Sequence, residues 1–182
     1  TPLPRYDLGV SVSKINKRQR NISKIRRLLA SNGLKETINY SFIDKESAEI
    51  FCGDKDLVML SNSISKEMTN LRPSLFPGLL EVVKKNQARG LNDIAIFEMG
   101  QIFYGSEPGE EILELSGVFT GYSNDRNAFQ DRRSYDIYDA KFCIEESLKT
   151  VGINLDSLFL DREVPSYFHP NKSAFIKLGK FK

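Results

Sequence analysis

The chain has 182 residues, of which 40% are hydrophobic and 27% are charged. This composition is typical of one ordinary globular domain and excludes a largely disordered polymer. The formal net charge is only +2, so total charge does not identify a nucleic-acid binder. The distribution is less even, because one N-terminal stretch contains no acidic residue and carries Lys14, Lys17, Arg18, Arg20, Lys24, Arg26 and Arg27.

The two cysteines, Cys52 and Cys143, lie far apart in a chain that has no signal peptide and no long apolar span. This pattern predicts free thiols, a cytoplasmic protein and no contact with a membrane. The sequence begins at Thr1 and stops within a strand-like segment at Lys182, which favours a piece of a larger polypeptide.

The N-terminal third contains an expected linker and the first elements of the domain. Residues 1–13, which include Pro2, Pro4 and Gly9, are expected to form an extended lead-in, and residues 14–182 one core domain. A helix is predicted over 21–31, and Gly33 is expected to end it. A strand at about 36–42, a short helix capped by Asp44 that runs to about 51, and a brief strand at 58–60 follow.

The most informative segment is 71–104. Ser74 is expected to cap a helix that runs to about 89, with Pro77 in its first turn and Gly90 at its end. One face of this helix is apolar at the spacing of an α-helix, through Leu75, Leu79, Val82 and Val83.

The strand predicted at 94–99 does not alternate polar with apolar residues, so both of its faces should be covered. Its one acidic residue, Glu98, then requires a cationic partner. We expect a structural ion pair with Arg72 or Arg89.

The remaining pattern continues to mix strands with helices. A polar loop is predicted at 105–111, a strand at 113–120, a polar loop at 121–134, a helix at 138–151, and strands near 157–161 and 173–178. Strands joined by hairpins and interspersed with helices indicate an α+β fold whose antiparallel or mixed sheet is flanked by helices.

Few residues of the chain suggest chemistry. Zinc is disfavoured because the chain has one histidine and its two cysteines are not closely paired. His169, in a Phe-His-Pro sequence, is expected to bond to the backbone of a turn. No G-x-G-x-x-G or G-x-x-x-x-G-K-[ST] sequence is present, which excludes nucleotide binding through those motifs.

Several segments, in order, resemble the beta subunit of bacterial phenylalanyl-tRNA synthetase, within its class II synthetase-like core. The strings are GLKETINYSF (33–42), LSNSISKEMTNLR (60–72), LRPSLFPGLL (71–80), the residues 86–89, IFEMGQIF (96–103), YDIYDAKFCIEESLKTVG (135–152) and FHPNKSA (168–174). The resemblance implies the same α+β fold. Because that fold needs more strands than we count, the core is expected to be incomplete at its C-terminus.

The resemblance also implies that this domain is non-catalytic. Class II synthetases hold ATP with an arginine on one strand and a second arginine on a later helix, whereas here Phe97-Glu98 lacks the preceding arginine. Without a cationic clamp there is little to stabilise charge at a phosphate. We therefore expect no catalytic, cofactor-binding or metal-binding residue in this chain. ATP and Mg²⁺ would serve the complete enzyme, at its alpha subunit.

The partners that the resemblance implies are the alpha subunit, within an (αβ)₂ heterotetramer, and tRNA(Phe). The candidate contact residues are Lys24, Arg26, Arg27, Arg72 and Arg89, although a solvated basic helix face explains the first three equally well. Elements at about 21–42 correspond to those that mediate class II dimer contacts, so exposed Leu, Ile or Phe is expected there.

Two alternatives stay open. One is a catalytic class II-like core that acts alone. The other is a general RNA-binding module that uses the basic stretch at 14–27, although no aromatic residues for base stacking are interleaved with it.

Overall fold

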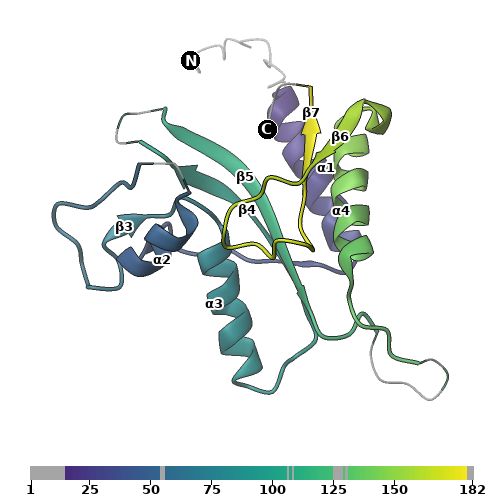
Figure 1. Ribbon diagram of the computed structural model, residues 1–182, viewed down its shortest axis with the longest axis horizontal. Helices are drawn as coiled ribbons and strands as arrows, with labels where there is room; N and C mark the ends of the chain where they lie inside the picture. The colour runs from purple at the N-terminus through teal and green to yellow at the C-terminus, as the bar shows by residue number, and fades with distance from the viewer. Residues whose placement is uncertain are drawn as a thin grey trace, which may run out of the picture.

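The computed structural model describes residues 15–53, 56–105, 107, 109–124, 129 and 131–179. The linker predicted at 1–13 lies outside these residues. The helices are α1 (Lys17–Ser31), α2 (Lys45–Phe51), α3 (Phe76–Gln87) and α4 (Ile137–Thr150), with a 3₁₀ turn at Leu155–Ser157. The strands are β1 (Lys35–Glu36), β2 (Phe42–Ile43), β3 (Asn70–Leu71), β4 (Ile94–Phe103), β5 (Glu111–Thr120), β6 (Leu158–Asp161) and β7 (Phe175–Leu178) (Figure 1).

The central sheet has the strand order β1-β4-β5 and mixes the two kinds of pairing. Strand β1 lies parallel to β4, whereas β4 and β5 form a long antiparallel hairpin that runs from Ile94 opposite Thr120 to Phe103 opposite Glu111. Two small antiparallel pairs, β2 with β3 and β6 with β7, lie outside this sheet. The predicted α+β class with a mixed sheet is confirmed.

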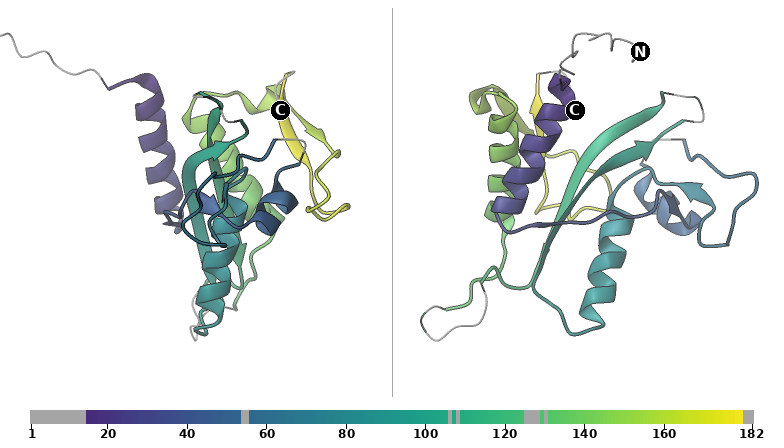
Figure 2. Two further views of the ribbon diagram at one scale, coloured as in Figure 1. Left: turned by 90° about the vertical axis from the view of Figure 1, so that its left-hand side faces the viewer. Right: turned by 180° about the vertical axis from the view of Figure 1, so that it is seen from behind.

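Strand β4 is covered on both faces, as its apolar sequence predicts. On one face, Ile94 and Ile96 pack with Leu79 and Val83 of α3. On the other face, Phe97 packs in a separate cluster with Leu29 of α1 and Leu34, and Cys143 of α4 lies against this cluster. Figure 2 shows α3 on one side of the hairpin and the pair α1 and α4 on the other.

Helix α1 begins earlier than the predicted residue 21. The Asn16 side chain accepts a hydrogen bond of 3.0 Å from the backbone N–H of Arg18 and so caps the helix at this earlier point. The sequence prediction started from the apolar pattern, which begins only at Ile22, and therefore missed a polar first turn. Gly33 follows the helix with a φ of 88°, as expected of a helix stop.

The single strand predicted at about 36–42 is wrong. Residues 37–41 instead leave β1 and pass to β2, which belongs to a different sheet. The reason is that Asn39 binds the buried carboxylate of Glu98 through both its backbone and its side chain. The strand predicted at 58–60 is likewise reduced to one isolated bridge between Met59 and Asn70.

Helix α3 begins without a side-chain cap at its N-cap position. Its N-cap position is Leu75, which offers no side-chain bond, and Pro77 stands in the first turn as predicted. Ser74, expected as the cap, lies one residue earlier, where its hydroxyl accepts a hydrogen bond of 3.3 Å from the N–H of Phe76. Gly90 follows the helix end with a φ of 83°.

Leu79 tests the contribution of α3 to the core. It is fully buried, whereas its neighbour Leu80 on the same helix is 45% exposed. We expect Leu79→Ala to lower the free energy of unfolding by about 2 to 5 kcal/mol, through lost burial and the cavity left behind. Urea unfolding measures this, with Leu80→Ala as the matched control. Equal losses for the two variants would contradict the packing described here.

Candidate functional site

A buried ion pair between Arg72 and Glu98 joins the segment before α3 to the centre of β4. The Nη1 of Arg72 lies 2.6 Å from Oε1 of Glu98. Arg72 is 4% exposed and Glu98 is 2% exposed. Arg72 is thus the partner of Glu98 in the structure, while Arg89 lies exposed beyond the end of α3.

Asn39 completes the hydrogen bonding of the Glu98 carboxylate. Its backbone N–H donates to Oε1 at 3.2 Å, and its side-chain Nδ2 donates to Oε2 at 2.7 Å. Both carboxylate oxygens therefore have donors, which is the condition under which a buried charge is tolerated. The sequence analysis missed Asn39, although a polar residue between Ile38 and Tyr40 was an available signal.

Gly100 and Gln101 of β4 lie against the guanidinium of Arg72. The Nε of Arg72 donates to the carbonyl of Gln101 at 2.9 Å. A Cβ at Gly100 would come within 2.3 Å of Nη2 of Arg72, so this strand position has no room for a side chain. A glycine inside a strand marks such a close approach, and this signal was also available in the sequence.

The geometry assigns Arg72 to internal structure. Its Nη1 reaches Glu98 and also lies 3.5 Å from the carbonyl oxygen of Asn39, and its Nε is taken by Gln101. With donors directed inward and the side chain buried, Arg72 is not presented to a molecule outside the domain. What the arrangement does chemically is to bind three segments of the chain together.

A double-mutant cycle measures this role. We expect Arg72→Met to lower the free energy of unfolding by about 3 to 5 kcal/mol, because it leaves the Glu98 carboxylate buried without its cation. The double variant Arg72→Met with Glu98→Leu should recover much of that loss, since neither charge is then buried. Denaturant unfolding of the single and double variants tests both expectations. A double variant no more stable than the worse single variant would contradict them.

The other predicted contact residues lie on outer surfaces. Lys24 and Arg27 are exposed on α1, and Arg89 is exposed after α3. Arg26 differs from them because its Nε lies 2.8 Å from Oε1 of Glu36, which ties α1 to β1. The structure does not bring these four cations together with Arg72.

His169 lies in a turn and bonds to the backbone. Its Nδ1 accepts a hydrogen bond of 3.1 Å from the N–H of Asn171, and its carbonyl accepts a bond from the hydroxyl of Ser173. This is the role predicted from the sequence. Both cysteines are free thiols, and burial raises the pKa of Cys143.

Among the described residues, no group of three or more His, Cys, Asp or Glu side chains is placed to hold a metal ion. Within the same residues, no helix is long and apolar enough to cross a membrane.

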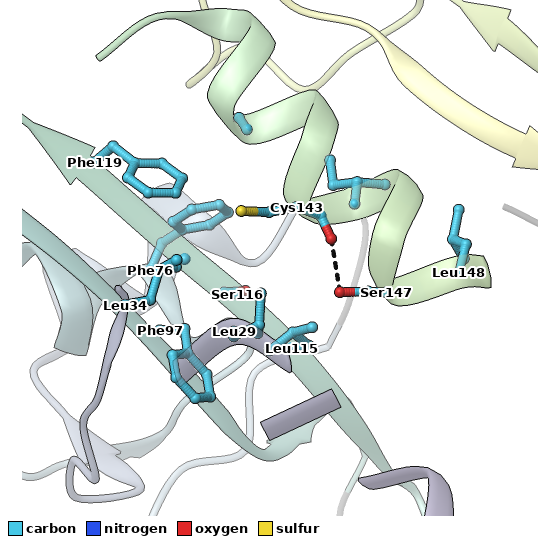
Figure 3. A pocket seen from close by; sticks show the side chains of 13 residues that line it. Leu29, Leu34, Phe76, Phe97, Leu115, Ser116, Phe119, Cys143, Ser147 and Leu148 are labelled. Atoms are coloured by element: carbon cyan, nitrogen blue, oxygen red, sulfur yellow. Dashed lines mark hydrogen bonds between the residues drawn. The ribbon is translucent and has the colours of Figure 1, made fainter. Parts of the chain in front are cut away.

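An apolar cavity of about 440 Å³ lies between the sheet, α1 and α4. Figure 3 shows the thiol of Cys143 near Phe76 and Phe119, with Leu115 and Phe97 on the sheet below. The hydroxyl of Ser147 donates a hydrogen bond of 2.7 Å to the carbonyl oxygen of Cys143. The lining therefore offers apolar contact but neither a charge nor an activated nucleophile.

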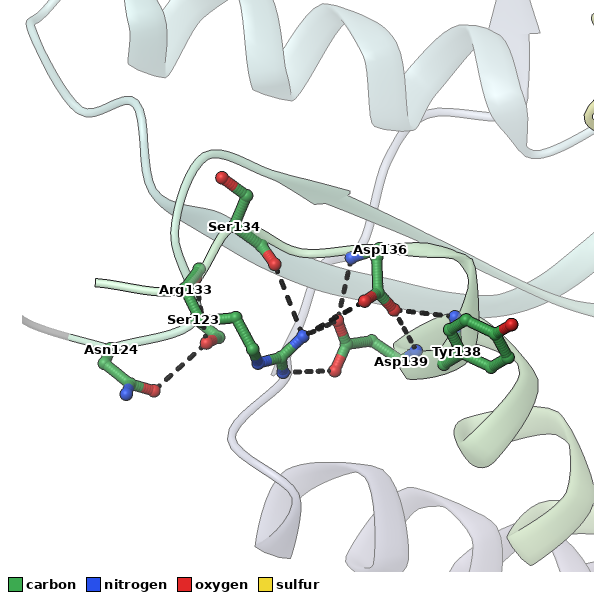
Figure 4. A network of polar contacts seen from close by, with 7 residues as sticks. All are labelled: Ser123, Asn124, Arg133, Ser134, Asp136, Tyr138 and Asp139. Atoms are coloured by element: carbon green, nitrogen blue, oxygen red, sulfur yellow. Dashed lines mark hydrogen bonds and ion pairs between the residues drawn. The ribbon is translucent and has the colours of Figure 1, made fainter. Parts of the chain in front are cut away.

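A polar network fixes the start of α4 (Figure 4). Asp136 and Asp139 form a capping box, in which each side chain accepts from the backbone of the other. Arg133 binds Asp139 with two hydrogen bonds, of 2.8 and 2.6 Å. The hydrogen bond from Arg133 lowers the pKa of Asp139.

This network makes stability depend on pH. Because the pKa of Asp139 is lower in the folded chain, its contribution is full at neutral pH. The contribution is lost as the pH falls through the unfolded value of about 3.9 towards the lower folded value. We expect Arg133→Met to flatten this part of the curve of unfolding free energy against pH, and Arg20→Met on α1 to leave it unchanged. Identical curves for wild type and Arg133→Met would contradict the assignment.

Large apolar side chains are exposed between β1 and β2. Ile38 is 91% exposed and Tyr40 is 77% exposed, while Asn39 between them turns inward to Glu98. Phe42 at the start of β2 is 36% exposed. We call residues 38–42 the apolar strip. It lies within the region 21–42, where exposed apolar residues were expected.

The fold of the domain is that of a tRNA synthetase core. A solved pyrrolysyl tRNA synthetase from Desulfitobacterium hafniense, PylSc, superposes with a TM-score of 0.60 at 17% identity, covering 87% of this chain and 54% of that one. At this identity the likeness establishes the fold alone.

The sequence establishes the family. Residues 4–182 match the family described as the phenylalanyl tRNA synthetase beta chain CLM domain, and the chain belongs to this family. It is 43% identical over 178 residues to the phenylalanine--tRNA ligase beta subunit of Cereibacter sphaeroides, and 34% identical over 179 residues to that of Rhodospirillum rubrum. These matches cover 98% of this chain but 22% of each relative, so the chain spans about a fifth of their length.

Proposed function

We propose that this chain is a non-catalytic structural domain of a phenylalanine–tRNA ligase, which packs on the alpha subunit of an (αβ)₂ enzyme in the cytoplasm. In this proposal the complete enzyme uses ATP and Mg²⁺ to attach phenylalanine to tRNA(Phe), and the chemistry takes place on the alpha subunit. The observation that carries the proposal is the buried Arg72–Glu98 pair, in which the arginine stabilises the fold and is not available to bind a phosphate.

The residues present do not fit ATP or its magnesium ion. Formation of an adenylate builds negative charge at a phosphate, which cationic groups must stabilise in place. Arg72 is buried and bonded to Glu98, and β4 carries no arginine or lysine. The donors for a metal are also not assembled within the part of the chain that the structure describes. In this proposal the domain therefore carries out no catalytic step.

The apolar strip supports the role in assembly. Ile38 and Tyr40 are exposed in the isolated domain, although side chains of this size are among those that proteins bury at interfaces. The backbone of the strip is fixed to the sheet, because Asn39 donates hydrogen bonds to Glu98 of β4. A surface anchored in this way is preorganised for a partner, which reduces the entropy lost on association.

Helix α1 supports a secondary role in holding tRNA. The helix contains no acidic residue, and its exposed cations include Arg20, Lys24 and Arg27. Such a face attracts phosphate, and binding through it weakens with added salt. Because Arg26 is paired with Glu36, we assign the contact to its exposed neighbours.

Co-elution with an alpha subunit tests the proposal. We expect the chain to co-elute on size-exclusion chromatography, and Ile38→Asp to weaken the complex by tenfold or more, or about 1.4 kcal/mol, because it places a charge in the interface. Ile64→Asp is the matched control, since Ile64 is 87% exposed but lies outside the apolar strip. Equal effects of the two variants would contradict the role of the strip.

A calorimetric titration addresses the catalytic alternative. Tight binding of ATP and phenylalanine by this chain alone would overturn the assignment of a non-catalytic domain.

A further inference from the structure

A second hollow lies between the end of α2, the residues ahead of α3, and the segment 163–168, which returns towards these helices after β6 (Figure 1). Its volume is about 940 Å³. We call it the aromatic cleft. It is separate from the apolar strip, and its lining combines aromatic rings with carboxylates.

Four rings form one continuous wall of the cleft. The rings of Phe51 and Tyr167 are 5.0 Å apart, those of Tyr167 and Phe168 are 4.8 Å apart, and those of Phe168 and Phe76 are 5.7 Å apart. These contacts join α2, α3 and the segment 163–168. Mutual contact restrains the rings, so the wall is formed before any ligand arrives.

The charge of the lining has one sign. Glu49, Glu114 and Glu163 line the cleft, and no lysine, arginine or histidine is among its described lining residues. Glu49 lies 3.5 Å from Lys45 in an exposed pair, whereas Glu114 is half-buried and accepts a hydrogen bond of 2.8 Å from the hydroxyl of Ser116. Glu114 lines the same cleft as the ring of Tyr167, and burial together with the charge of Glu114 raises the pKa of Tyr167.

We infer that the aromatic cleft receives an arginine side chain of a polypeptide partner. A planar guanidinium stacks on aromatic faces and donates in pairs to a carboxylate, which are the two kinds of group that the cleft presents. The same charges repel phosphate and carboxylate groups, so the cleft excludes nucleotides. This inference does not depend on the alpha subunit being the partner.

Titration of the full chain with N-acetyl-arginine amide, followed by NMR, tests the inference. We expect shifts in the aromatic signals of Phe51, Phe76, Tyr167 and Phe168, and an affinity that falls as salt is added. N-acetyl-citrulline amide has nearly the same shape but no charge, and should bind at least about fivefold more weakly.

Matched variants assign the site. Glu114→Gln should weaken binding of the arginine probe by about fivefold, and Tyr167→Leu by a similar factor through loss of the ring. Glu111→Gln is the control, because it makes the same change of charge on the same strand outside the cleft. If Glu114→Gln disturbs folding, as judged by circular dichroism, Glu163→Gln at the exposed rim replaces it. Absence of probe-induced shifts, or equal binding of the citrulline probe, would overturn the inference.

Discussion

The ion pair between Arg72 and Glu98 is the interaction on which the rest of this domain depends. It lies where the segment ahead of α3, the centre of β4 and the loop after β1 meet. A charge in such a position is costly to bury, and only a nearly complete set of hydrogen bonds makes it tolerable. Asn39, Gly100 and the carbonyl of Gln101 supply that set or make room for it. They show how one buried carboxylate imposes requirements on residues far apart in the chain.

The same interaction connects structure to function. A synthetase core that holds a nucleotide needs cations directed outward at phosphate. Here Arg72 is buried and directed inward at Glu98, and this supports a domain whose contribution is structural. Asn39 also links the pair to the apolar strip, since it lies between the exposed Ile38 and Tyr40. The internal network and the proposed partner surface therefore share one segment of backbone.

The two surfaces of the domain differ in chemistry. The apolar strip presents the exposed side chains of Ile38 and Tyr40, which suit burial against a second subunit. The aromatic cleft presents rings beside carboxylates, which suits a cation. The apolar cavity of Figure 3 lies between β4, β5, α1 and α4, with Phe76 at the start of α3 also in its lining, and it offers no charged group. The apolar strip, the aromatic cleft and the apolar cavity therefore differ in the chemical groups that each presents.

Local signals in the sequence were sufficient for the strongly periodic elements. The apolar face of α3, the doubly apolar β4 and the cap at Asp44 all followed from spacing and side-chain chemistry, because these depend on neighbours along the chain. The family followed from ordered segments of resemblance. Glu98 was recognised as needing a cation because a carboxylate in an apolar strand has no local solution.

Only the tertiary structure decided which cation pairs with Glu98 and which other segments of the chain are altered to satisfy that carboxylate. Arg72 and Arg89 are both near α3 in sequence, but only Arg72 reaches β4. The predicted strand at 36–42 was broken because its central residue Asn39 satisfies a group 59 positions away in the sequence. The aromatic cleft was invisible for the same reason, since Phe51, Phe76 and Tyr167 belong to separate elements. Interactions between distant segments depend on how the chain folds back on itself, and no local pattern encodes that distance.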